Sequence, residues 1–403
     1  MQSKTKKRWK KVLIWTAVAL VLILAVIALG AWRKFGTFIV AARSIHKLQD
    51  GLYVMVYRGD YGFDEFLAQG GAADDSAVAD YLIGFLSRGY YKKADNEIRP
   101  GDFGCSTICV KDKNGDVYFG RNFDWEKGRA MIVLTVPENG YESLSTCDLD
   151  FLGFGDDYQP DGSMRERIQT LAAIYVPLDG MNEKGLVVAD LMAGDDEETH
   201  QKTDKSDLTT TTAIRLLLDR AANVDEAIEL LKQYDMNSSI GAAHHFSIAD
   251  ATGKSVVVEY VNGEMLVTET NIVTNHYLSD CPKKGVGSEQ SHQRFDWLNN
   301  RIGPDFVLAG RVGYGRGILV TRLPFQEVLT LLAPITQSQL RIMSPQADGD
   351  QDVTLWSIVY APGKQWADFY FHEDFDNGHR LYLRPEINNE NKFISPTPDI
   401  EFD

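Results

Sequence analysis

A run of 21 uncharged residues, 12–32, constrains the N-terminal part of this chain more than any other feature. A helix rises about 1.5 Å per residue, so the run is long enough to cross the roughly 30 Å hydrocarbon layer of a bilayer. Six Lys and Arg residues precede it without any acid, whereas only Arg33 and Lys34 follow directly. This asymmetry predicts a single-pass anchor with a cytoplasmic N-terminus and the bulk of the chain outside the cell.

A cleaved signal peptide is the alternative interpretation of the same run. The apolar region of a signal peptide usually has about 7–15 residues, which is shorter than the run in this chain. Small residues at 28–31, Ala-Leu-Gly-Ala, would nevertheless suit a signal peptidase. We therefore expect a retained membrane anchor, with secretion after signal cleavage as the alternative.

Charge and cysteine content exclude several other classes of protein. The whole chain has a formal charge of −16, and because residues 1–34 contribute +8, the rest carries −24. Nucleic acid is therefore not an expected partner, since phosphate binding needs a basic face. The four cysteines show no zinc-site spacing, and we expect neither metal nor organic cofactor. Cys147 and Cys281 are one candidate disulfide in an extracellular domain.

The rest of the sequence falls into blocks of strands and blocks of helices. Residues 75–91 have apolar side chains at helical spacing, and residues 96–104 form a turn-rich loop. Asn114-Gly115 lies between two β-prone runs, which indicates a hairpin. Blocks of this kind predict an α+β fold. The expected strands are 106–111, 117–122, 131–136, 185–191, 244–250, 254–260, 265–270, 353–360 and 366–373, and further helices are expected at 208–222, 224–234, 290–301 and 324–332.

Cys105 is the candidate nucleophile. It begins the first strand, and the hairpin folds Arg121 and Asp124 back toward it. A thiol attacks as its thiolate, which a nearby Arg favours. If the chain is cut before Cys105, the new α-amine has a reference pKa of about 7.7–8 and could act as the general base, held by Asp124.

These residue types alone leave simpler interpretations open. A single Cys at the start of a strand is more often buried and inert. Arg121 and Asp124 could form a structural ion pair. A Cys–His pair involving His244, His245 or His276 is a further, less favoured option.

The spacing of Cys105, Arg121 and Asp124 resembles that of the choloylglycine hydrolase and penicillin V acylase family, which includes isopenicillin acyltransferases and acid ceramidases. In that family an Arg follows the catalytic Cys by sixteen residues and an Asp by nineteen, in a segment like Gly-Arg-Asn-x-Asp-Trp. Residues 120–125 read Gly-Arg-Asn-Phe-Asp-Trp. The resemblance extends over about residues 101–360.

Three more site residues are implied by this resemblance. Residues 179–186, Asp-Gly-Met-Asn-Glu-Lys-Gly-Leu, are similar to a family segment whose Asn contributes to the oxyanion hole, which points to Asn182. Residues 274–276, Thr-Asn-His, point to Asn275 as a second oxyanion donor. Residues 291–294, Ser-His-Gln-Arg, point to Arg294 near the thiol, although Arg301 and Arg311 compete for that role.

The long segment before Cys105 resembles the self-cleaving branch of the family, in which the precursor cuts itself before the Cys. We expect cleavage between Gly104 and Cys105, because a glycine permits a strained turn. The expected parts are residues 1–34, a basic end and transmembrane anchor; residues 35–104, a linker and N-terminal segment; and residues 105–403, the catalytic domain. The implied fold is the four-layer αββα sandwich of N-terminal-nucleophile hydrolases.

The activity implied by the resemblance is hydrolysis of a linear amide through an acyl-enzyme on Cys105. Its partner would be a small N-acyl amide such as a bile-salt conjugate, penicillin V, an N-acyl amino acid or a lipid amide. An acyltransferase that uses an amine acceptor and a non-catalytic tethered binding protein are the alternatives. The sequence leaves the oligomeric state open, with a homo-oligomer as one option.

Overall fold

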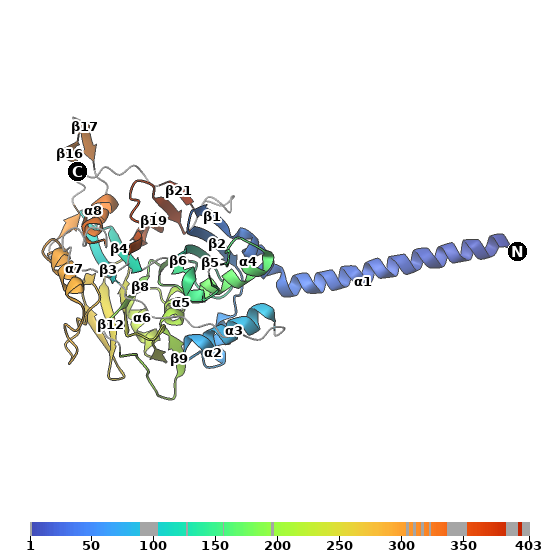
Figure 1. Ribbon diagram of the computed structural model, residues 1–403, viewed down its shortest axis with the longest axis horizontal. Coiled ribbons are helices and arrows are strands. Elements are labelled where there is room, and N and C mark those ends of the chain that lie inside the picture. Colours follow the sequence, from blue (N-terminus) through green and yellow to red (C-terminus); the bar gives the residue numbers. More distant parts are fainter. Residues whose placement is uncertain are drawn as a thin grey trace.

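The computed structural model describes residues 2–88, 104–125, 128–155, 157–194, 197–303, 306–308, 312–315, 318–321, 324–336, 353–383 and 394–396. Helix α1 (Gln2–Ser44) projects from one side of the folded body (Figure 1). Its part Leu13–Ser44 has a most apolar window of mean hydropathy 2.8 that is not buried, and it is long enough to cross a membrane. By length and composition this helix fits an anchor and a signal sequence alike.

The last turns of α1 pack into the body instead of forming a flexible link. Phe38 and Ala41 are each 1% exposed, and the ring of Phe38 lies 5.3 Å from that of Phe85. The guanidinium of Arg167 donates to the carbonyls of Ala42 and Ile45 at the end of the helix. The first part of the expected linker, residues 35–44, therefore continues helix α1, because the apolar side chains of these residues pack against the core of the body.

Two mixed β-sheets lie face to face within the described residues. The first runs in the order β1 (His46–Gln49), β2 (Leu52–Arg58), β5 (Ala130–Val136), β6 (Ser143–Asp148), β7 (Asp179–Asn182), β8 (Val187–Met192), β11 (His244–Ala249), β12 (Ser255–Val261), β13 (Glu264–Glu269). The second runs β14 (Ile272–Val273), β3 (Gly104–Asp112), β4 (Val117–Trp125), β18 (Val353–Ala361), β19 (Trp366–Phe371), β20 (His379–Tyr382), β21 (Ile394–Pro396), with β15 (Val307–Leu308) beside β3.

Helices cover the outer faces of the two sheets, so the described residues form three large apolar cores, beside one small cluster around Tyr277. The middle core joins the inner faces, with Ile132 of the first sheet and Trp356 of the second. The outer core of the first sheet includes side chains of α1, α2 (Phe63–Ala68), α3 (Asp75–Ser87), α5 (Thr210–Arg220) and α6 (Val224–Leu231). The outer core of the second sheet includes α7 (Glu289–Asn299) and α8 (Pro324–Leu332).

The remaining elements are short. They are α4 (Met164–Thr170), the parallel pair β9 (Ser206–Thr209) and β10 (Tyr234–Asn237), the pair β16 (Val312–Gly315) and β17 (Ile318–Thr321), and the 3₁₀ segments Leu149–Leu152, Leu171–Tyr175, Ala333–Ile335 and Pro362–Lys364. The expected α+β class is confirmed, as are the hairpin at Asn114-Gly115 and the later blocks of helices and strands. The sequence pattern missed several strands, among them β1, β2, β6 and β7. The part of the expected loop at 96–104 that precedes Gly104 lies outside the described residues.

The N-terminal segment is built into the first sheet. β2 pairs in parallel with β5 along its whole length, from Leu52 opposite Ala130 to Arg58 opposite Val136. Gly71 forms a bridge to Asp207, and a side chain there would place its Cβ 1.9 Å from the Asp207 carbonyl oxygen, so only glycine allows this approach. Residues before Gly104 therefore share a core with residues after it.

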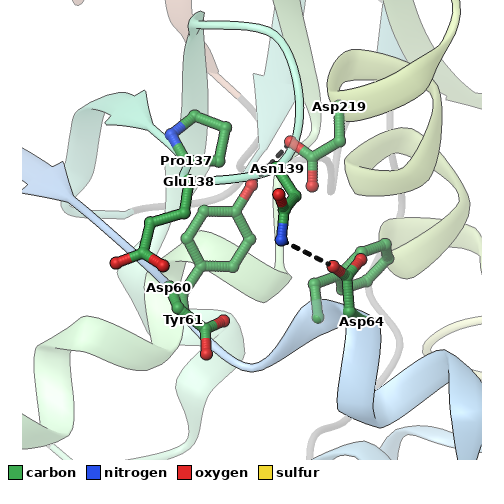
Figure 2. Close-up of a pocket in the computed structure, with 8 residues that line it drawn as sticks. Asp60, Tyr61, Asp64, Pro137, Glu138, Asn139 and Asp219 are labelled. Atoms are coloured by element: carbon green, nitrogen blue, oxygen red, sulfur yellow. Dashed lines mark hydrogen bonds between the residues drawn. The ribbon is translucent and has the colours of Figure 1, made fainter.

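A hollow at this junction is drawn in Figure 2. It is lined on one side by Asp60, Tyr61, Phe63 and Asp64 and on the other by Pro137, Glu138, Asn139 and Asp219. The Tyr61 hydroxyl points across it and donates to the Asp219 carboxylate at 2.6 Å. The hollow contains none of the residues expected at the catalytic site, and it marks the seam between the N-terminal segment and the rest of the body.

Candidate active site

Cys105 lies in β3, with its side chain in the layer between the two sheets. Alternation along a strand places Cys105, Thr107 and Cys109 on one face. Cys105 and Cys109 both belong to the middle core, and the Thr107 hydroxyl reaches Ser247 of the first sheet at 2.9 Å. Cys105 is 2% exposed. The shared face that the sequence predicts is therefore confirmed.

Arg121 reaches the sulfur from the neighbouring strand β4. Its Cα is paired with that of Thr107, two residue pairs along the ladder from Cys105 and Phe123. Arg121 Nη2 lies 3.8 Å from Cys105 Sγ, and Nη1 lies 2.5 Å from Asp179 Oδ2. The same guanidinium also donates to the carbonyls of Leu178 and Asp190. These contacts fix the cation beside the thiol.

Asp179 is the site residue that sequence reasoning missed. It is fully buried, and its carboxylate accepts hydrogen bonds from Thr146, Trp356 and Tyr360 in addition to its ion pair with Arg121. A carboxylate with this many partners holds the Arg121 guanidinium in one position. The sequence offered one indication of Asp179, since it is the first residue of the 179–186 segment, which the sequence analysis had already identified as a possible part of the site.

Asn182 is not brought to Cys105. Its amide donates to the carbonyls of Leu218 and Ala221, and its oxygen accepts from the backbone of the following turn. The physical reason is strand parity: Asp179 and Met181 point into the middle layer, whereas Asn182 and Gly180 point toward α5. A Cβ on Gly180 would lie 2.7 Å from a methyl carbon of Leu218. In this structure Asn182 therefore shapes a turn and a helix end.

Arg294 and Asn275 approach the backbone of Cys105 from the other side of β3. The Asn275 side-chain oxygen accepts from the Cys105 N–H at 2.6 Å, and Arg294 Nη2 donates to the same oxygen at 2.9 Å. Arg294 Nη1 donates to the Cys105 carbonyl and to the Ser106 hydroxyl. The segment from Gly104 to Ser106 is thus held by two side chains from distant parts of the sequence.

Asp124 lies opposite Gly104 in the β3–β4 ladder. Its carboxylate accepts from the Thr354 hydroxyl at 2.6 Å and lies 3.8 Å from Arg294 Nη1. The Cys105 N–H, which Asp124 was expected to hold as an amine, is bound by Asn275 in this structure. Gly104 itself is a buried residue of the strand β3.

Burial raises the pKa of the Cys105 thiol to about 11, although the Arg121 guanidinium partly offsets this and Asp124 adds to it. At neutral pH the thiol of the uncut chain is therefore protonated. A thiol in this state needs a base to become a nucleophile. The intact chain offers no free amine at Cys105, because that nitrogen is an amide.

The three histidines considered as partners of Cys105 have other contacts. His244 is paired with Asp190, His245 with Glu259, and His276 with Ser291. Cys147 and Cys281 are both free thiols, so the candidate disulfide is not formed. Among the described residues, no group of three or more His, Cys, Asp or Glu side chains could hold a metal ion.

Glu259 holds the segment that carries Asn275. Its carboxylate accepts from the backbone N–H groups of Leu278 and Ser279 and from His245. Burial raises the pKa of Glu259, but these hydrogen bonds outweigh it and lower the pKa to about 2. The ionised carboxylate therefore stabilises the folded state above the ordinary glutamate pKa, and this contribution is lost as the pH falls toward 2.

We expect Glu259→Gln to lower the melting temperature at pH 7, because a neutral amide replaces a carboxylate that has two backbone donors. The difference from the wild type should shrink steadily as the pH falls from about 4.5 toward 2. Thermal unfolding measured over this pH range checks it. A difference that is constant with pH would contradict the assigned ionisation.

Residues 105–278 match the family described as linear amide C–N hydrolases, choloylglycine hydrolase family. A bile salt hydrolase/transferase of Clostridium perfringens is 28% identical over 250 residues, which cover 53% of this chain and 66% of that protein. A penicillin V acylase of Pectobacterium atrosepticum is 31% identical over 100 residues, which cover 22% of this chain and 26% of that protein. The chain thus spans less than two thirds of the length of either relative.

Two solved structures are also similar. A mutant of the conjugated bile acid hydrolase from Clostridium perfringens is 17% identical with a TM-score of 0.42, covering 74% of this chain and 99% of that one. The penicillin V acylase of Agrobacterium tumefaciens is 17% identical with a TM-score of 0.40 over the same shares. The α+β class itself follows from the sheets and helices described above. Over residues 105–278, this chain is therefore similar to the choloylglycine hydrolase family of linear amide C–N hydrolases.

Proposed function

We propose that this chain is a membrane-anchored cysteine amidohydrolase whose nucleophile, Cys105, is released by self-cleavage of the Gly104–Cys105 bond. The observation that carries the proposal is the arrangement around Cys105: Arg121 at 3.8 Å from its sulfur, and Asn275 and Arg294 bound to its backbone. The two face-to-face sheets with helices outside support assignment to the four-layer αββα class of N-terminal-nucleophile hydrolases.

Self-cleavage would begin with attack of the Cys105 sulfur on the Gly104 carbonyl carbon. The Gly104–Cys105 C–N bond then breaks, the nitrogen takes a proton to become the α-amine, and Gly104 is left as a thioester on the sulfur. Water hydrolyses the thioester, which gives a Gly104 carboxylate and a free Cys105 thiol. The high thiol pKa of the uncut chain makes thiolate formation the costly part of this step.

The mature site would then use the freed amine as its base. The amine nitrogen is the atom that Asn275 already binds at 2.6 Å, so the Asn275 oxygen is suited to orient it. The amine takes the thiol proton, the sulfur attacks the substrate carbonyl, and the same proton passes to the leaving amine. Water resolves the acyl-enzyme. Arg121 stabilises the thiolate, with Asp179 as its fixed counter-charge.

A substrate with a linear amide is the class that this site would accept. The names of the two relatives, a bile salt hydrolase/transferase and a penicillin V acylase, support an N-acyl amide. The first name also includes acyl transfer, so an amine acceptor is the second candidate for the acyl group. A panel of N-acyl amides, assayed with and without an added amine, separates hydrolysis from transfer by the product formed.

The anchor and the catalytic part would stay together after the cut. Residues 1–104 contain α1, which carries the proposed anchor, and also β2, which pairs with β5 across the seam. We therefore expect both pieces to co-purify from detergent in one complex and to separate only in denaturant. Size exclusion followed by denaturing electrophoresis checks this. Recovery of a freely soluble 105–403 chain under native conditions would contradict it.

A further inference from the structure

A chain of buried hydrogen bonds leads from the Arg121 guanidinium away from Cys105. Arg121 Nη2, the atom 3.8 Å from the sulfur, donates to the Asp190 carbonyl on β8 at 2.6 Å. The side chain of Asp190 is 8% exposed, and its carboxylate contacts His244 at the start of β11. Asp190 therefore contacts Arg121 through its backbone and His244 through its side chain.

His244 carries a proton on both ring nitrogens in this arrangement. Its Nδ1 lies 2.9 and 3.0 Å from the two carboxylate oxygens of Asp190, and its Nε2 lies 3.0 Å from the Ser239 carbonyl. A carboxylate and a carbonyl can only accept, so both nitrogens must donate, which requires the imidazolium. Burial lowers the pKa of His244, but the adjacent Asp190 carboxylate outweighs it and the net shift is upward.

The chain continues to the N-terminal segment. The Ser239 hydroxyl donates to Asp75 Oδ1 at 2.9 Å, and the Ile240 N–H donates to Asp75 Oδ2 at 2.8 Å. Asp75 is the first residue of α3. Ile240 has a φ of 48°, which a β-branched residue adopts only when its surroundings hold it there. The two bonds to Asp75 provide such a restraint.

We propose that Asp75, Ser239, His244 and Asp190 form a positioning network that holds Arg121 against the Cys105 sulfur. This inference rests on the proposed function, because it assigns the network to the site at which Cys105 acts. Through Asp75, the N-terminal segment would continue to position Arg121 after the Gly104–Cys105 bond is cut. Loss of the contact with Asp75 loosens residues 238–243, and the effect passes through His244 and Asp190 to the cation that stabilises the thiolate.

Among the described residues, the acidic groups whose charges act on His244 come from two elements. Asp190 on β8 bonds to it directly, and Asp75 on α3 acts through Ser239. Because the pKa of folded His244 is raised, its contribution to stability is complete below the ordinary histidine pKa and is lost as the pH rises through the folded value. The wild type should therefore lose its advantage in melting temperature over His244→Gln as the pH rises.

Ser239→Ala and Ser238→Ala are a matched pair of variants that test the network in the full anchored chain. Ser239→Ala removes the hydroxyl bonded to Asp75 but keeps the carbonyl bonded to His244. The hydroxyl of the neighbouring Ser238 accepts from the Thr199 N–H instead, outside the network. The first readout is the rate at which iodoacetamide alkylates Cys105, followed by mass spectrometry, because it needs no substrate.

We expect Ser239→Ala to lower the alkylation rate at pH 7 about fivefold, and His244→Gln to lower it about tenfold or more, because the displaced Arg121 stabilises the thiolate less. Both should lower kcat more than they raise KM, with Ser238→Ala unchanged. Two results would overturn the proposed network. One is an equal effect of Ser238→Ala and Ser239→Ala on the alkylation rate, and the other is a Ser239→Ala or His244→Gln variant with a lower melting temperature but an unchanged alkylation rate. Amide hydrolysis that persists in Cys105→Ala would overturn the proposed function instead. The alkylation rates of the variants that keep Cys105 would still show whether the network positions Arg121.

Discussion

Replacement of Cys105 by alanine is expected to abolish both cleavage of the Gly104–Cys105 bond and amide hydrolysis. The sulfur is the only atom of this side chain that can form either acyl intermediate, and loss of such a nucleophile lowers kcat by about 10⁴-fold or more in comparable enzymes. The variant should fold, since the side chain is small and the layer around it consists of paired strands. Electrophoresis reports the cut, and product analysis of an N-acyl amide panel reports turnover.

Cys109→Ala is the matched control for this result. Cys109 is a free thiol, 3% exposed, on the same face of the same strand and four residues further on. Burial raises the pKa of its thiol to about 12, although a hydrogen bond with Ser255 and the charge of Lys111 partly offset this. Cys109→Ala should retain both cutting and turnover, with only a modest loss of stability. Loss of activity in both variants would mean that the effect comes from the strand and not from the nucleophile.

Arg121→Gln is expected to have the largest effect on stability, about 3–5 kcal/mol, because it leaves the fully buried Asp179 carboxylate without its counter-charge. It should also lower turnover strongly, since the thiolate of Cys105 loses its neighbouring cation. Denaturant unfolding gives the first quantity and steady-state kinetics the second. Arg220→Gln, which breaks an exposed pair with Asp64, should cost only about 0–1 kcal/mol.

A double variant separates the two roles of Arg121. Arg121→Gln combined with Asp179→Asn removes both buried charges, so much of the lost stability should return. Activity should not return, because the cation beside the sulfur is still missing. Recovery of turnover in the double variant would show that Arg121 acts only as a structural partner of Asp179. The sequence left a purely structural role for Arg121 open, but with Asp124 as the partner.

Local sequence patterns predicted the part of the site that one hairpin builds. Alternation along β3 and the Asn114-Gly115 turn were enough to place Arg121 beside the face that carries Cys105, because both depend on neighbours in sequence. Asn275 and Arg294 were expected only from resemblance. Asn275 reaches Cys105 from the segment that follows β14, and Arg294 from α7; no local rule specifies how these parts pack against β3.

Asn182 shows where motif matching fails in physical terms. Its segment does lie beside the middle layer, but strand parity makes Asp179, three residues earlier, the side chain that enters this layer. The sequence could not predict the network of Asp75, Ser239, His244 and Asp190, since its members come from three separate elements and one loop. The buried start of β2 was missed because its continuous apolar run shows no alternation.

Mass determination and N-terminal sequencing of the purified chain test the central claim most directly. We predict that active wild-type protein contains a chain of residues 105–403 that begins with a free Cys105 α-amine, together with a separate chain that ends at Gly104, whereas Cys105→Ala remains a single chain. A protein that hydrolyses amides at full rate while every molecule remains one uncut chain of 403 residues would contradict this prediction.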